Sequence, residues 1–441
     1  MPVYLVGLPQ LIPELQWMLV GEQINKGFVM YSEIWDNTAP LSTLVYAGID
    51  GLFGRSQSVY QIVALLLTYF QAVYFNVMVN NRDLFAKRNY LPGLFYLLFM
   101  NISFDCCTLS PVLMATTFVL LSLGTLVKQM NRLQATDEVF EIGFFIGLAT
   151  LFYPPAGVFI LWATSSLLFF SGTTLRQHSL SIFGFLFPLL LTALFFYLNG
   201  TYDAFSRNFI SSVLQLRQYD LNDFRSLLAT LLLPFTFGVL GFLRLVNAVG
   251  FNNYQIRCQQ VMMIWAIAGV VSIGLMPFLA PMQFIIFVPA IAFFTVSFFN
   301  NTKRAWLAEL TCLALFSAVL LIHYQAVYFK GVETFVQLKN LKLKEEPEIK
   351  LSNKKILVFG DGMEEYKNNF AATPYINWSL AKYELENLDN YNNVINILSN
   401  FEKDYPEVII DKVNLTPKLF KRIPVLARKY HAVGNGVYEL N

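Results

Sequence analysis

Long apolar runs separated by short polar loops fill the chain from about residue 58 to residue 329. A helix needs roughly 20 apolar residues to cross a bilayer, and ten runs reach or approach that length. They lie at 58–80, 90–104, 109–129, 138–153, 155–171, 179–200, 226–245, 260–277, 282–300 and 305–329. The pattern predicts a polytopic α-helical membrane protein with about ten transmembrane helices.

The segment before the first run mixes apolar and polar positions. IPELQWMLVGEQINKG (12–27) has apolar residues at helical spacing, and APLSTLVYAGIDGLFG (39–54) is apolar but short and glycine-rich. Both are typical of juxtamembrane helices that lie in the membrane interface. A later segment, 201–224, shows the same amphipathic mixture and carries the same prediction.

The last part of the chain has the pattern of a small α/β domain. KKILVFG (354–360) predicts a buried strand that ends at Asp361-Gly362, PEVIID (406–411) predicts a second strand, and GVYEL (436–440) a third. A long polar helical stretch separates the first two. The GDG turn lacks the further glycine of a dinucleotide fingerprint, so nucleotide binding is not expected there.

Composition supports a membrane domain followed by a water-soluble one. Of 441 residues, 56% are hydrophobic and 14% charged, and mean hydropathy is +0.50, which excludes a soluble globular chain. Positions 331–441 hold 15 basic and 15 acidic residues, which leaves 16 and 14 for everything before them. The net charge is only +2, and the basic residues are not clustered in any one region of the sequence, so nucleic acid is not expected as a partner.

The cysteines and histidines lack metal-ligand spacing, and adjacent Cys106 and Cys107 are interpreted as small packing residues.

These patterns divide the chain into four regions. We expect an outer-face loop with juxtamembrane helices at 1–57, a transmembrane helical domain at 58–330, a charged linker at 331–350 and an extracytoplasmic α/β domain at 351–441. Basic residues are retained in cytoplasmic loops, and this orientation places ten of them inside and six outside. Because residues 1–57 would then be translocated with no helix ahead of them, we expect that an upstream transmembrane helix is missing from this sequence.

Several acids fall near the predicted outer face of the membrane domain. The four that matter most are Glu14, Glu33, Asp36 and Asp105. A carboxylate costs roughly 2.5 to 3.5 kcal/mol at the bilayer centre and less near the interface, so it needs water, a partner or a function. We therefore predict a watery outer cavity. The structural alternatives stay open, because Glu33 and Asp36 are also suited to a solvated loop, Glu14 to an amphipathic helix, and Asp105 to capping the helix that begins near 109.

The acids stand in or near a recognisable motif, G-x-x-x-Y-x-[DE]-x-W-D-x-x-x-P-L followed by LFG. It resembles the first outer loop of the type-C glycosyltransferase superfamily, which includes polyprenyl-phosphate-sugar-dependent mannosyltransferase-like and aminoarabinose-transferase-like membrane proteins. PMQFIIFVPAIAFF (281–294) is similar to a late helix of that superfamily, and the layout also resembles uncharacterised bacterial relatives. The matching residues of the loop are Gly27, Tyr31, Glu33, Trp35, Asp36, Pro40, Leu41 and Leu52-Phe53-Gly54.

The resemblance implies an inverting glycosyltransferase that uses a polyprenyl-phosphate-linked sugar donor on the outer face of a bacterial inner membrane. Asp36, Glu33 or Glu14 would be the general base, with Asp105 as the acid of the second loop. The donor phosphate would be held by Arg55, Arg207, Arg217 or Arg225, among which the spacing does not select, and Tyr31 and Trp35 would stack on sugar. No cofactor and no metal-ligand set are assigned, although paired carboxylates permit a divalent cation.

The chain departs from the superfamily at two places. It has Thr38-Ala39-Pro40-Leu41 where Lys-Pro-Pro-Leu is common, and Met282-Gln283 where a basic residue often stands. The alternative is a non-catalytic membrane scaffold subunit of an envelope secretion, motility or polymer-export complex, in which 351–441 binds another envelope protein. A transporter is disfavoured, because the sequence shows neither mid-span acids nor an inverted repeat.

Overall fold

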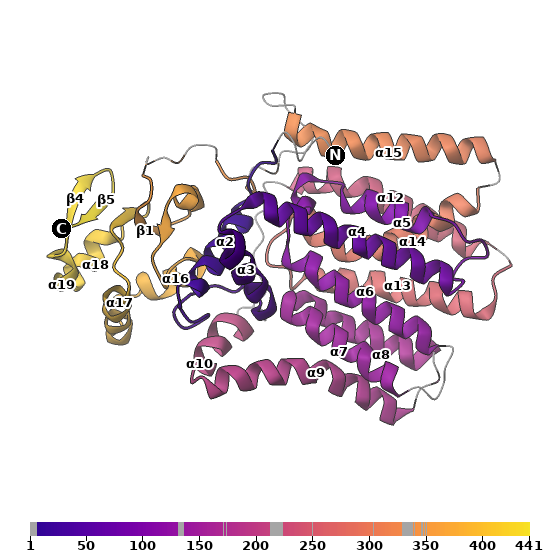
Figure 1. Ribbon diagram of the computed structural model, residues 1–441, viewed down its shortest axis with the longest axis horizontal. Helices are drawn as coiled ribbons and strands as arrows, with labels where there is room; N and C mark the ends of the chain where they lie inside the picture. The colour runs from indigo at the N-terminus through magenta and orange to yellow at the C-terminus, as the bar shows by residue number, and fades with distance from the viewer. Residues whose placement is uncertain are drawn as a thin grey trace. The chain divides into compact units, whose positions relative to one another are not determined.

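The computed structural model is predominantly helical and divides into two compact units (Figure 1). Unit 1 comprises Met1–Pro9, Ser58–Leu194 and Gln215–Asn340, and unit 2 comprises Gln10–Gln57, Phe195–Leu214 and Leu341–Asn441. Arg217 and most of the predicted linker lie outside the described residues. The described residues are 7–130, 136–170, 172, 174–211, 224–248, 250–302, 304–328, 338, 340–344, 347, 349 and 351–441.

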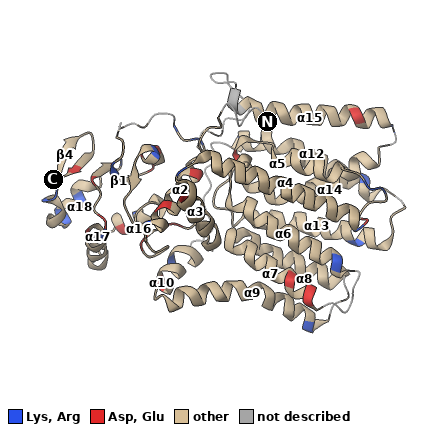
Figure 2. Ribbon diagram, in the orientation of Figure 1, with Lys and Arg blue, Asp and Glu red and all other residues tan. Residues whose placement is uncertain are grey.

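Unit 1 holds the apolar helices. Within the described residues, seven helical stretches are long and apolar enough to cross a membrane, and two shorter ones are apolar, which supports a multi-pass membrane protein. In unit 1 the charged residues lie at helix ends rather than in the middles (Figure 2). The elements are α4 (Gln57–Asn81), α5 (Leu91–Met100), η1 (Phe104–Cys107), α6 (Pro111–Gln129), α7 (Asp137–Phe152), η2 (Pro154–Val158), α8 (Phe159–Phe170), α9 (Leu175–Leu198, whose last residues belong to unit 2), α12 (Phe224–Val246), α13 (Asn253–Ile273), η4 (Pro281–Phe287), α14 (Val288–Asn300) and α15 (Ala305–Tyr328).

Each of the ten predicted runs overlaps one of these helices. The largest displacement is at α13, which begins at Asn253 rather than at 260, because its polar first turns hid the start of the helix. Prolines shape two of the helices, because η2 starts at Pro154 and η4 at Pro281, and each 3₁₀ turn leads directly into an α-helix. How many helices actually span the bilayer stays a prediction.

The centre of unit 1 is aromatic. Trp162 of α8 and Trp265 of α13 meet edge to face, with ring centroids 5.0 Å apart. Each indole N–H donates to a backbone carbonyl, that of Trp162 to Val261 at 3.0 Å and that of Trp265 to Ile286 at 2.9 Å. The second bond fixes α13 against η4, so the late segment 281–294 is buried inside the unit.

Unit 2 begins with two packed helices, α2 (Ile12–Asn25) and α3 (Pro40–Phe53). Trp17 stacks on Tyr46 with ring centroids 5.6 Å apart and an angle of 7° between the ring planes. Gly21 lets the helices approach closely, because a Cβ there would be 2.7 Å from the carbonyl of Tyr46. The structure confirms helices at both predicted positions. α2 is buried over most of its length, and whether the pair lies in a membrane interface stays a prediction.

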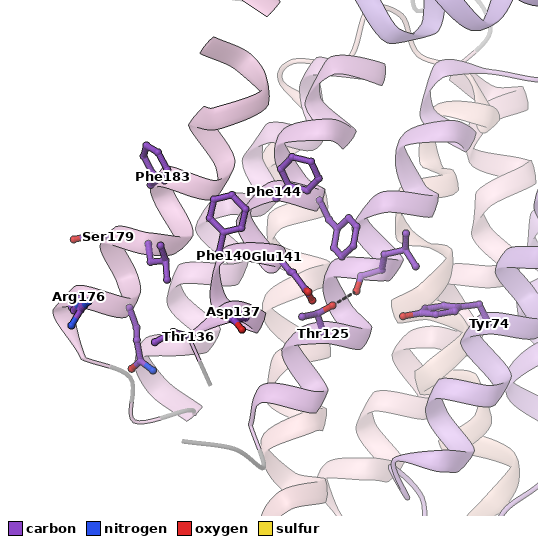
Figure 3. Close-up of a pocket in the computed structure, with 14 residues that line it drawn as sticks. Tyr74, Thr125, Thr136, Asp137, Phe140, Glu141, Phe144, Arg176, Ser179 and Phe183 are labelled. Atoms are coloured by element: carbon purple, nitrogen blue, oxygen red, sulfur yellow. Dashed lines mark hydrogen bonds between the residues drawn. The ribbon is translucent and has the colours of Figure 1, made fainter. Parts of the chain in front are cut away.

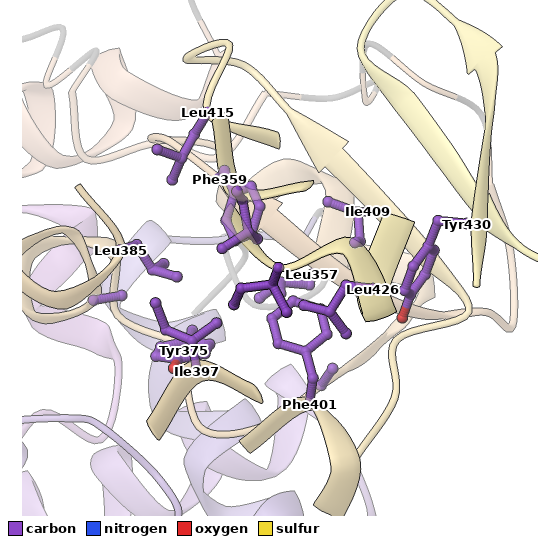
Figure 4. Close-up of a cluster of buried hydrophobic side chains, with 14 residues drawn as sticks. Leu357, Phe359, Tyr375, Leu385, Ile397, Phe401, Ile409, Leu415, Leu426 and Tyr430 are labelled. Carbon is purple, nitrogen blue, oxygen red and sulfur yellow. The ribbon is translucent and has the colours of Figure 1, made fainter. Parts of the chain in front are cut away.

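The C-terminal part of unit 2 contains a five-stranded sheet of order β2-β1-β3-β5-β4. The parallel strands are β1 (Lys355–Phe359), β2 (Phe370–Ala371) and β3 (Val408–Asp411), and β5 (Val437–Leu440) and β4 (Tyr430–Gly434) pair antiparallel beside β3. The sequence predicted β1, β3 and β5 and missed β2 and β4. Helices α16 (Trp378–Leu385), α17 (Tyr391–Lys403), α18 (Thr416–Arg422) and α19 (Pro424–Ala427) enclose a core of apolar side chains (Figure 4).

Three chain segments build unit 2 together. Ile12 donates its N–H to the carbonyl of Leu341 at 2.9 Å, and the side-chain amide of Gln23 donates to the carbonyl of Ala371 at 2.8 Å. The middle segment contributes α10 (Tyr202–Phe205) and the π-helical η3 (Ser206–Ser211). The predicted first loop and the C-terminal α/β region therefore fold as one unit.

Candidate functional site

Asp36 is buried in unit 2 and accepts four hydrogen bonds. Oδ1 accepts from the backbone N–H of Thr38 at 2.7 Å and from the Thr38 hydroxyl. Oδ2 accepts from the side-chain amides of Gln16 and, at 3.4 Å, Asn377. With both oxygens occupied, the carboxylate has little capacity left for a substrate proton. Asp36 instead ties the first loop to α2 and to the C-terminal segment.

Glu14 and Glu33 have partners within unit 2 as well. Glu14 is buried in the first turn of α2, where Oε2 lies 3.4 Å from the N–H of Leu11 and 3.2 Å from the amide of Gln57. That position suits a carboxylate that caps a helix N-terminus. Glu33 accepts from the N–H of Val29 at 3.0 Å and pairs with Lys403 at 3.4 Å.

The two aromatic residues expected to stack on sugar are packed within unit 2. Tyr31 is fully buried, donates its hydroxyl to the carbonyl of Thr38 at 2.7 Å and contacts the ring of Phe205, with centroids 5.5 Å apart. Trp35 meets Tyr375 edge to face at 5.2 Å, and its backbone N–H donates to Pro374 at 2.9 Å. These contacts fasten the loop to the rest of the unit, and a role in sugar binding stays a prediction.

Arg55 is held by a carboxylate and two carbonyls. It forms an ion pair with Glu22 and donates Nη1 to the carbonyls of Tyr366 at 2.9 Å and Asn369 at 2.8 Å. The side chains of Arg55 and Glu22 are only 18% and 10% exposed, so this is a largely desolvated pair. The guanidinium of Arg55 therefore joins the end of α3 to the C-terminal segment.

Arg207 was also expected to hold the donor phosphate, and it has fewer contacts than Arg55 in the described part of the chain. It is exposed on η3, and its Nε lies 3.5 Å from the carbonyl of Asp203. It also acts electrostatically on Glu384 of α16. Burial raises the pKa of Glu384 to about 7, while the Tyr375 hydroxyl, 3.1 Å away, and the charge of Arg207 lower it in part. Nothing in the polar stretch around Glu384 marked it in the sequence.

Asp105 differs from the other three predicted acids and lies in unit 1. It is fully buried in η1, and its Oδ2 accepts the N–H of Met282 at 2.8 Å. Oδ1 has no hydrogen bond of normal geometry among the described residues, although the Ser103 hydroxyl and the backbone N–H groups of Asp105 and Cys106 are close enough to stabilise the charge of the carboxylate in part. Burial raises the pKa of Asp105 to about 6.

Among the other buried side-chain atoms that have no hydrogen bond of normal geometry within the described residues, two lie on segments that pack against η1. They are Oε1 of Gln283, the residue after the donor to Asp105, and Nδ1 of His323 in α15, whose ring also interacts with the backbone of Asn101. Buried polar atoms are nearly always hydrogen-bonded, and such exceptions gather where water or a ligand binds. We therefore take Asp105, Gln283 and His323 as the candidate site. No three His, Cys, Asp or Glu side chains come together as metal ligands in the part of the chain that the structure describes.

Comparisons with known proteins find a structural likeness. No family model matches the chain, and no curated protein matches it significantly. Among solved structures, the chain is similar to the archaeal oligosaccharyltransferase AglB from Archaeoglobus fulgidus, in complex with an inhibitory peptide and a dolichol-phosphate. The match has 12% identity and a TM-score of 0.46, and covers 98% of this chain and 70% of that one. A likeness at this level assigns no role to any residue, so the role of each side chain must come from its own contacts.

Proposed function

We propose that the protein is an inverting glycosyltransferase that takes its sugar from a polyprenyl-phosphate donor on the outer face of a bacterial inner membrane. The observation that carries the proposal is the state of Asp105. Its Oδ2 is anchored to the N–H of Met282, its Oδ1 has no hydrogen bond of normal geometry within the described residues, and its pKa is about 6. A general base works best when its pKa lies near the operating pH and its geometry is fixed.

In the proposed reaction, Oδ1 of Asp105 takes the proton of an acceptor hydroxyl. The acceptor oxygen forms a bond to the anomeric carbon while the bond from that carbon to the phosphate oxygen breaks. Polyprenyl phosphate leaves with the electron pair, and the configuration at the anomeric carbon inverts. Gln283 and His323, on segments that pack against η1, carry polar atoms that are suited to the hydroxyls of a sugar or to ordered water.

Asp36 and Glu14 would then have structural roles within unit 2. Asp36 and Glu14 hold the fold of the first loop through the hydrogen bonds described above. A phosphate-binding role for Arg207 stays a prediction from the sequence; its side chain is exposed, whereas Arg55 is bound to Glu22 and two carbonyls. Arg217 stays a prediction on the sequence alone.

The test is transfer of radiolabelled sugar from polyprenyl-phosphate donors in native membranes, with variants at equal expression. Asp105→Asn is expected to abolish transfer, whereas Glu33→Gln, which alters a partly exposed acid of the first loop, is the comparison and should retain it. Full activity of Asp105→Asn would overturn the assignment of the base. No protein-dependent transfer with any donor would reject the enzyme.

A non-catalytic membrane scaffold is the second candidate, and one observation favours it. Three of the predicted acids, Glu14, Glu33 and Asp36, have structural partners. The late segment also carries Met282-Gln283 in place of a basic residue. In that case residues 351–441 would bind an envelope protein. Co-purification of a stoichiometric partner, lost on deletion of 351–441, together with absent transfer, would favour this function.

A further inference from the structure

A second feature of unit 1 is a hollow of about 1080 Å³ between α4, α6, α7 and α9 (Figure 3). Pockets that hold ligands usually measure about 300–1,000 Å³, so this one can take a large amphipathic molecule. Three of the helices that wall it, α4, α6 and α9, are among the candidate membrane spans. The hollow is separate from Asp105, which does not line it.

The shape of the hollow follows from close packing beside it. A Cβ at Gly143 of α7 would be 1.9 Å from the carbonyl oxygen of Ser181, and one at Gly184 of α9 would be 2.4 Å from that of Phe140. The backbones of α7 and α9 therefore touch at these positions. Bulky rings flank the contact, with the centroids of Phe140 and Phe183 6.3 Å apart, and both rings line the hollow.

The lining of the hollow is apolar at one end and charged at the other. Phe144 and Phe183 lie at one end in Figure 3, while Asp137 and Arg176 lie at the other, where α7 and α9 begin. Glu141 lies one turn further along α7, on the side of Thr125. All three charged side chains are exposed, and no ion pair joins Arg176 to either acid in the described part of the chain. Charged residues at a helix end mark the headgroup level of a bilayer.

We propose that this hollow binds one phospholipid with a zwitterionic headgroup that carries a primary ammonium, as in phosphatidylethanolamine. Arg176 contacts the phosphate, Glu141 and Asp137 accept hydrogen bonds from the ammonium, and one acyl chain lies along Phe144 and Phe183. The charges favour this occupant over a purely anionic lipid, because two carboxylates would face a headgroup that offers them no cation. A polyprenyl phosphate is disfavoured for the same reason.

The experiment is native mass spectrometry of the purified full-length protein in detergent, titrated separately with phosphatidylethanolamine, phosphatidylcholine, phosphatidylglycerol and undecaprenyl phosphate. Phosphatidylcholine is the critical comparison, since its methylated ammonium cannot donate hydrogen bonds. We expect one phosphatidylethanolamine to be retained about tenfold more tightly than the others. Equal retention of all four would identify ordinary surrounding lipid, and preference for an anionic lipid would overturn the proposed headgroup contacts.

Variants test the same contacts. Glu141→Gln and Arg176→Gln are each expected to abolish the preference. Their matched controls are Glu309→Gln on α15 and Arg225→Gln on α12, which alter exposed charges at helix ends away from the hollow. If a hollow variant is unstable in detergent, the wild-type comparison of phosphatidylethanolamine with phosphatidylcholine still decides the proposal. Preference retained in a stable Glu141→Gln or Arg176→Gln variant would also reject it.

Discussion

The backbone N–H of Met282 donates a 2.8 Å hydrogen bond to Oδ2 of Asp105 and so joins two segments that are 177 residues apart in the chain. One segment contains Asp105, the predicted acid of the second loop. The other contains 281–294, which is similar in sequence to a late helix of the type-C glycosyltransferase superfamily. Because the bond occupies Oδ2, the proposed reaction uses Oδ1 as the oxygen that takes a proton from an acceptor.

Replacement of Asp105 should separate catalysis from structure. Asp105→Asn keeps the size of the side chain and removes the base, so transfer should fall by about 10²- to 10⁴-fold. In the wild type, transfer should rise with pH through about 6, as the carboxyl loses its proton. The measurement is the pH–rate profile of both proteins in native membranes, and a wild-type rate that is flat from pH 5 to 8 would contradict the assignment.

The same carboxyl should make stability depend on pH in the opposite direction. Its pKa is raised from 3.8 to about 6 in the folded protein, so the folded state binds the proton more tightly than the unfolded state. This contribution, about 3 kcal/mol, is fully present below pH 3.8 and is lost as pH rises through about 6. Denaturant unfolding in detergent should therefore show the wild type losing stability relative to Asp105→Asn across that window.

Asp36 gives a second discriminating test. Asp36→Ala leaves the donors on Thr38, Gln16 and Asn377 without their shared acceptor, and we expect a loss of about 3 kcal/mol of unfolding free energy. Transfer should decline only as the folded fraction declines. A variant of unchanged stability that has lost all transfer would instead make Asp36 the base.

The ion pair of Glu22 and Arg55 should be energetically coupled. Because these side chains are largely buried, a double-mutant cycle with Glu22→Gln and Arg55→Gln should give about 2 kcal/mol of coupling in unfolding free energy. The exposed pair of Asp83 and Arg88, with side chains 63% and 67% exposed, is the internal control and should give below about 1 kcal/mol. Equal coupling in both cycles would mean that burial does not strengthen the first pair.

Glu384 should titrate near neutral pH and respond to two neighbours. Arg207 and Tyr375 both lower its pKa from the value that burial alone would give, so Arg207→Gln and Tyr375→Phe should each move it above about 7. The folded-state pKa is raised, so the stability from this group is present below pH 4.5 and is lost as pH rises through about 7. Infrared titration of the carboxylate in glutamate-labelled protein measures the shift, and a Glu384→Gln sample identifies its band.

The helices of unit 1 were predictable because each arises from a local apolar run. The run at 58–80 became α4, Gln57–Asn81, and the run at 109–129 became α6, Pro111–Gln129. The strand β2 was missed because Phe370–Ala371 is too short to show a pattern of its own.

The candidate site was predictable only in part. Sequence spacing selected Asp36 and Asp105 but gave them no partners, and the partners decide their roles. Asn377 meets Asp36 from 341 residues away, and His323 and Gln283 come to the neighbourhood of η1 through packing of distant helices. The raised pKa of Glu384 likewise depends on burial by segments that are remote in sequence.

The three-segment construction of unit 2 has a consequence for how the protein is made. Residues 10–57 leave the ribosome long before 341–441, a delay on the order of tens of seconds at about 5–20 residues per second. During that interval Asp36 lacks its hydrogen bond from Asn377, and Arg55 lacks the carbonyls of Tyr366 and Asn369 that accept its hydrogen bonds. The first loop is therefore only partly folded until the C-terminal segment has been synthesised. Loss of the C-terminal residues, by a premature stop codon or by proteolysis, would leave that state permanent and mark the chain for quality control.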